Sequence, residues 1–67
     1  MKIISIFNQF SKTKRVLVYE ERYKPNDYRY RVDVYNINRR GETLTEQIPF
    51  KSKGASLAMA RIILNRE

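Results

Sequence analysis

The fold is decided by residues 50–64, FKSKGASLAMARIIL, which carry the pattern of an amphipathic helix with two lysines ahead of it. Apolar residues recur here at i, i+3, i+4, i+7 and i+8, the spacing that lines one face of an α-helix. The expected face consists of Ala55, Ala58, Met59, Ile62 and Ile63, widened by Leu57, Ala60 and Leu64. Ser52 is placed to cap the helix, and no Pro or Gly interrupts residues 55–67. We therefore expect a C-terminal helix whose apolar face is covered by the rest of the chain.

The composition indicates one small, basic domain. Sixty-seven residues leave room for a single core, so the expected domain spans residues 1–67. Fourteen Lys and Arg against seven Asp and Glu give a net charge of +7, which is typical of a protein that binds polyanions. The chain has no Cys, and the apolar cluster at residues 3–7 is too short to cross a membrane. We expect a soluble, cytoplasmic protein with no membrane partner, metal or cofactor.

Upstream of the C-terminal helix, the sequence predicts a helix and three strands. Residues 1–11 match helical spacing but also contain three β-branched isoleucines, and we expect a helix there. The expected strands are residues 16–23, 28–35 and 42–50. Turn chemistry separates them, and Pro49 suits the end of an edge strand because proline cannot donate to a ladder. The expected fold is α+β, in the order α-β-β-β-α, with a three-stranded antiparallel sheet and both helices on one face.

Catalysis is not expected, because the groups that it usually needs are missing. The chain contains no His and no Cys, the side chains that most often transfer protons or attack substrates near neutral pH. Glu20 and Glu21 are adjacent, and neighbours in a strand point to opposite faces, so the two carboxylates do not form an acid and base pair. We expect them to pair with nearby Arg or Lys, and we expect the protein not to be an enzyme.

With the expected element order α-β-β-β-α, four short stretches of the sequence together resemble the double-stranded-RNA-binding domain family. They are SIFNQF at 5–10, YEE at 19–21, KPND at 24–27 and KSKGAS at 51–56. The resemblance implies binding across one face of duplex RNA, with the first helix and the first hairpin loop in successive minor grooves. The resemblance further implies that the lysines at the start of the second helix contact the phosphates of the major groove that lies between these two minor grooves. The candidate RNA-binding residues are Asn8, Gln9, Lys12, Lys24, Pro25, Asn26, Lys51 and Lys53.

Lys51 and Lys53 are candidates independently of this resemblance. Phosphates favour the N-terminus of a helix, where free N–H groups and the helix dipole are positive, and two lysines add two full charges. Contacts of this kind set affinity but not sequence preference.

Three alternatives use other surfaces. Residues 28–35, 39–41 and 50–55 resemble the sheet-plus-helix DNA-binding domains of phage integrases and plant AP2 factors, which implies that Arg29, Arg31 and Tyr35 read a DNA major groove from the outer sheet face. The second alternative is a small phage-type protein that docks on an acidic host protein. The third is a homodimer through an exposed edge strand. Exposure of Tyr19, Tyr23 and Tyr35 on the outer face would favour a protein partner.

Overall fold

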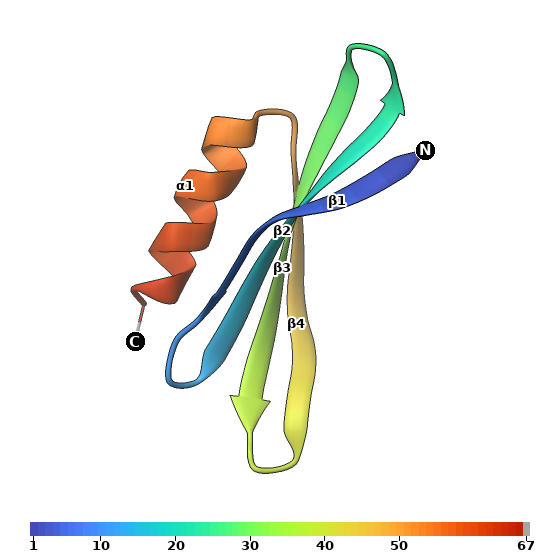
Figure 1. Ribbon diagram of the computed structural model, residues 1–67. Coiled ribbons are helices and arrows are strands. Elements are labelled where there is room, and N and C mark those ends of the chain that lie inside the picture. Colours follow the sequence, from blue (N-terminus) through green and yellow to red (C-terminus); the bar gives the residue numbers. More distant parts are fainter. Residues whose placement is uncertain (67) are drawn as a thin grey trace.

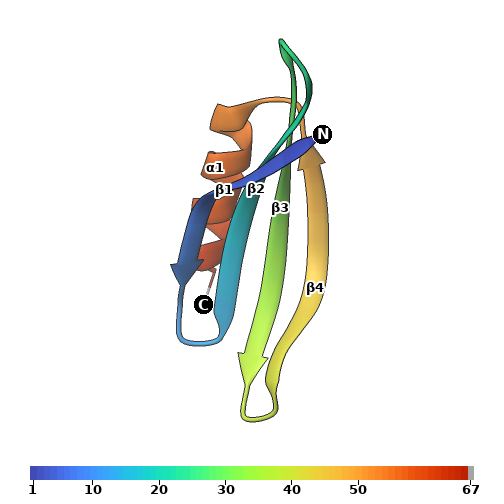
Figure 2. The same cartoon turned by 45° about the vertical axis from the view of Figure 1, so that its right-hand side comes forward.

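A computed structural model, in which residues 1–66 are described, shows one small domain with four strands and one helix (Figure 1). The elements are β1 (Lys2–Phe10), β2 (Lys14–Lys24), β3 (Asp27–Asn38), β4 (Gly41–Phe50) and α1 (Lys53–Leu64). The strands form a single antiparallel sheet in the order β1-β2-β3-β4, so each strand pairs with its neighbour in the chain. Figure 2 shows α1 lying against one face of this sheet and leaving the other face open.

The expected order α-β-β-β-α is wrong, because residues 2–10 form the strand β1 and the sheet therefore has four strands. A bulge explains why this stretch imitates a helix. The register with β2 shifts between Ser5 and Phe7, and as a result Ile6 and Phe7, although adjacent, both pack against the core. Ile3 and Phe10 instead lie on the opposite side and are 49% and 61% exposed. The spacing 3, 6, 7 and 10 thus comes from two faces of a bulged strand.

The other three expected strands are confirmed, each with slightly wider bounds. Asn26 stands in the tight turn after β2, and Gly41 begins β4 directly after the turn that follows β3; both have positive φ, the conformation that Asn tolerates and Gly adopts freely. Pro49 lies in β4, an edge strand, one residue before its end. Local turn chemistry therefore located these reversals correctly.

The core lies between the sheet and α1. It is built from four valines of the two central strands and two residues of the helix: Val16, Val18, Val32, Val34, Ala60 and Ile63. Each of these side chains is at most 4% exposed. Burial of apolar surface on this face is what holds α1 on the sheet.

The helix itself is confirmed, but the face expected to be buried is wrong by about one residue. Ser56, Ala60 and Ile63 are buried, whereas Ile62 is 50% exposed and Ala58 is exposed. Ser56 can face the sheet because its hydroxyl donates to the Lys53 carbonyl oxygen at 2.7 Å, which satisfies its polar group inside the helix. A pattern of apolar residues alone does not place a serine in the core.

The N-terminus of α1 is capped as expected. The backbone N–H of Ala55 donates to the Ser52 hydroxyl oxygen at 3.3 Å. This bond satisfies one of the free donors of the first turn. The cap fixes the point at which the chain turns from β4 into the helix, directly after Lys51.

Candidate functional site

The open face of the sheet is the surface opposite α1. Side chains alternate along a strand, so the residues between the core valines face away from the helix. In the two central strands the open face consists of Arg15, Leu17, Tyr19, Glu21 and Tyr23 from β2, and Arg29, Arg31, Asp33 and Tyr35 from β3. Arginines and tyrosines alternate with acids over this surface.

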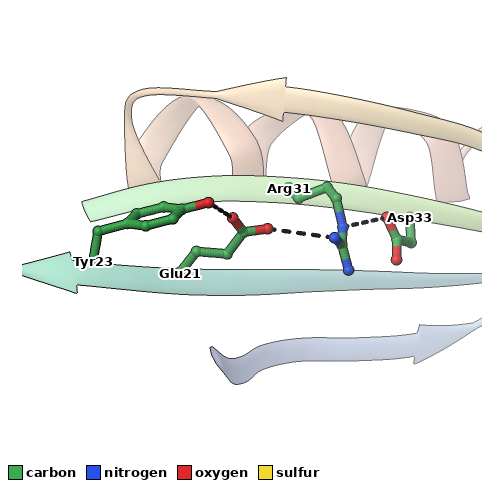
Figure 3. Close-up of polar contacts among 4 residues, drawn as sticks. All are labelled: Glu21, Tyr23, Arg31 and Asp33. Carbon is green, nitrogen blue, oxygen red and sulfur yellow. Dashed lines mark hydrogen bonds and ion pairs between the residues drawn. The ribbon is translucent and has the colours of Figure 1, made fainter. Parts of the chain in front are cut away.

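A chain of polar contacts runs along the open face (Figure 3). The Tyr23 hydroxyl donates to a Glu21 carboxylate oxygen at 2.6 Å, and the Arg31 guanidinium lies 3.4 Å from the other one. Arg31 Nε also donates to Asp33 Oδ1 at 3.0 Å, and Asp33 is only 2% exposed. The Arg31 side chain lies over the Tyr19 ring, 5.1 Å from its centroid. Arg31 is therefore held by two carboxylates and serves to neutralise a buried acid.

The same contacts fix the state of Tyr23. Its hydrogen bond to Glu21 is the main cause that raises the pKa of the Tyr23 phenol above the ordinary value of 10.0. The phenol is therefore neutral near pH 7 and keeps its proton for the bond to Glu21. The ring of Tyr23 has a fixed position even though the side chain is exposed.

The arginines of the open face differ in what holds them. Arg15 Nη1 lies 3.0 Å from a Glu42 oxygen, and Arg15 Nε donates to the Asn8 side chain at 3.1 Å. Arg29 is exposed and lies over the Tyr23 ring, 4.8 Å from its centroid. Within residues 1–66 no carboxylate lies within 4.0 Å of the Arg29 guanidinium. Arg29 thus carries the uncompensated charge of the open face.

The hairpin of β2 and β3 extends beyond both neighbouring strands. The pairing of β1 with β2 starts at Lys2 and Arg22, and the pairing of β4 with β3 ends at Phe50 and Tyr30. The hairpin tip therefore projects as a two-stranded ribbon, visible at the top of Figure 1.

A hollow of about 620 Å³ lies where β4 leaves the sheet beside this ribbon. Tyr23 lines it from the open face, and Tyr30 and Phe50 border it from strand positions whose side chains alternate to the helix side of the sheet. Arg29 and Lys51 also line it, and among the described residues Lys51, like Arg29, has no carboxylate within 4.0 Å. Two cations without carboxylate partners and the Tyr23 side chain therefore lie around one concavity.

The residues expected from the sequence fall at two ends of the molecule. Lys24, Pro25 and Asn26 lie at or beside the hairpin tip, and Lys51 and Lys53 flank the helix cap, at the same end of the sheet. The remaining candidates, Asn8, Gln9 and Lys12, lie at or beyond the other end of β1, beside the turn into β2. Tyr35 is half-buried on the open face. The structure thus brings Lys51 together with Arg29 and Arg31, although the sequence had assigned them to rival sites.

Sequence reasoning did not find the hollow, which is bordered by the paired residues Tyr30 and Phe50. Tyr30 and Phe50 meet because they are cross-strand partners, and their pairing depends on the register of β3 with β4. The sequence did contain a pattern that predicts the polar contacts of the open face. Residues two apart in a strand share a face, and this spacing relates Glu21 to Tyr23 and Arg31 to Asp33.

No family model matches the chain. The comparisons with curated proteins and with solved structures likewise give no match. The resemblances to RNA-binding and DNA-binding domains therefore stay predictions. In the described part of the chain, no helix has the length and apolar character that a membrane crossing requires.

Proposed function

We propose that the protein binds nucleic acid, without catalysis, at the hairpin end of the sheet, meaning the surface formed by Tyr23, Lys24, Arg29, Lys51 and Lys53. The observation that carries this proposal is the convergence of Arg29 and Lys51, both without carboxylate partners among the described residues, on a hollow that Tyr23 also lines. Phosphates are bound by such free cations, and bases stack on aromatic rings.

The charge around the hollow supports the same proposal. Lys24 at the hairpin and Lys53 at the first residue of α1 are both exposed and flank the two cations of the hollow. Glu21, the acid of the hollow, is engaged by Tyr23 and Arg31. The hairpin end therefore presents a net positive surface to a polyanion.

The two nucleic-acid expectations from the sequence are changed by the fold. The RNA interpretation placed a first helix in one minor groove, and a strand now occupies that segment. The DNA interpretation required the Arg31 guanidinium to contact base edges. This guanidinium is instead bound by Asp33 and Glu21. We therefore expect phosphate contacts by Arg29 and Lys51, with little dependence on sequence.

A protein partner is less well supported by the open face. Of the three tyrosines whose exposure would favour it, Tyr19 and Tyr35 are half-buried, and Tyr23 is 39% exposed. The rings of Tyr19 and Tyr23 are already covered by arginines on one side. The following experiment would indicate a protein partner if the protein bound no nucleic acid.

The proposal is tested by titrating the protein with one sequence prepared as single-stranded RNA, duplex RNA and duplex DNA, over a range of salt. We expect the double variant Arg29→Glu/Lys51→Glu to bind its best ligand more than tenfold more weakly. A loss of about 1.4 kcal/mol of binding free energy weakens binding tenfold, and this variant loses two phosphate contacts. The slope of log affinity against log salt should fall by roughly 0.7 to 0.9 per lost contact.

The matched control is Arg39→Glu/Arg40→Glu, which changes the net charge equally in the exposed turn between β3 and β4 at the other end of the sheet. We expect it to bind within about threefold of the unchanged protein, because screened charges at a distance contribute little. Equal weakening by both variants, with circular dichroism unchanged, would show that only the total charge matters. An absence of binding to all three ligands would exclude nucleic acid and leave a protein partner.

A further inference from the structure

We infer that the hollow at the hairpin end holds one unpaired nucleotide of a single strand, with the phosphate on Arg29 and Lys51 and the base against the Tyr23 ring. This inference rests on the proposed function and specifies the form of nucleic acid. It would distinguish the protein from a binder of duplex surfaces.

The size and position of the hollow support a single nucleotide. Its volume of about 620 Å³ lies within the roughly 300–1,000 Å³ of pockets that enclose small ligands. It forms at an edge of the sheet, where β4 ends at Phe50 and the chain turns through Lys51 into α1. In a duplex the bases are stacked inside and cannot enter such a side pocket. An unpaired base can be splayed out into it.

The charges of the hollow match one phosphodiester. Three cationic side chains line it together with one acid, Glu21. Glu21 and Arg31 satisfy one another at 3.4 Å, and Asp33 also holds Arg31. The three cations with the acids Glu21 and Asp33 leave a net charge of +1, and the cations without carboxylate partners among the described residues are Arg29 and Lys51. A neutral or cationic ligand would leave both unpaired, whereas a nucleotide phosphate compensates them.

The Tyr23 ring is already positioned for stacking. The Tyr23 ring is fixed at its hydroxyl by Glu21, and the Arg29 guanidinium lies over the ring at 4.8 Å. Rings and guanidinium planes are the surfaces on which proteins stack unpaired bases. Because Tyr23 is anchored, little side-chain entropy is lost when a base binds.

The experiment compares two single-stranded DNA ligands of about ten nucleotides, within the site sizes of single-strand binders: oligothymidine and an abasic strand of equal length and charge. We expect the unchanged protein to bind oligothymidine about fivefold to tenfold more tightly than the abasic strand, which is the contribution of one stacked base. Tyr23→Ala should lose this preference while keeping its affinity for the abasic strand. Tyr23→Phe, which keeps the ring, should retain most of the preference.

Other outcomes are equally informative. Equal affinity of the unchanged protein for both strands would overturn the nucleotide pocket, and the phosphate contacts of the proposed function would stand if Arg29→Glu/Lys51→Glu still weakened binding. Equal affinity for thymidine monophosphate and for the strand would overturn the assignment to a strand and indicate a free nucleotide. Stronger competition by duplex than by single strand would also overturn it. Failure of both strands to bind, with duplex RNA or duplex DNA still bound, would overturn this inference and leave the proposed function, whereas failure of every nucleic acid would contradict the proposed function itself.

Discussion

Ile63→Ala is expected to lower the free energy of unfolding by about 3 kcal/mol, the loss typical of removing a buried aliphatic side chain and leaving a cavity. Ile63 is 4% exposed and belongs to the cluster that joins α1 to the valines of β2 and β3. A domain of this size rarely has more than about 3–5 kcal/mol of stability, so much of the variant should be unfolded in buffer. Urea unfolding followed by circular dichroism, with an osmolyte present to populate the folded state, measures the difference.

The neighbouring residue provides the control. Ile62→Ala should cost less than about 1 kcal/mol, because Ile62 is 50% exposed and alanine is the better helix former. The same chemical change is thus made at adjacent positions, of which Ile63 is buried against the sheet and Ile62 is half exposed. Equal losses at both positions would mean that α1 is rotated to the phase that its apolar spacing predicts, with Ile62 in the core.

Phe7→Ala is expected to lower the free energy of unfolding by about 2 kcal/mol, somewhat less than the 3–5 kcal/mol of a fully buried phenylalanine. Phe7 is half-buried, lies opposite Val18 and packs against the core from β1. Its loss opens one side of the cluster and weakens the hold of an edge strand on the sheet. The same urea titration measures the effect.

Phe10→Ala is the matched change on the other face of β1. Phe10 is 61% exposed, and its ring lies under Arg15 at 5.3 Å. We expect a loss below about 1 kcal/mol, which includes the contribution of an exposed cation–π contact. In a helix over residues 1–11 the two phenylalanines would share one face. Similar losses would therefore contradict the strand β1.

Much of the fold could be predicted from residues alone. The alternation in Tyr28–Tyr35 and the turn residues around Asn26 and Gly41 located three strands, and an uninterrupted apolar run located the helix. The first strand could not be assigned, because a bulge at Ile6 breaks its period of two and produces helical spacing. The phase of α1 was missed because Ser56 satisfies its own hydroxyl and enters the core.

The sequence identified individual residues of the candidate site, but it did not predict that they lie together. Lys51 was named for its place before a helix, and Arg29 for its place on an open sheet face. Their meeting depends on where β4 leaves β3, which the register of the sheet sets and local sequence does not. Glu20 and Glu21 do lie on opposite faces, and each pairs with an arginine, Glu20 with Arg22 and Glu21 with Arg31, as their spacing predicted.

Binding of nucleic acid at the hairpin end is tested most directly by mapping the backbone amide resonances of the protein while single-stranded DNA is added. We predict the largest shifts in residues 23–31 and around Lys51, with small changes at the β1–β2 and β3–β4 turns at the other end of the sheet. Largest shifts at those two turns, or on the outer face of α1, would contradict the account.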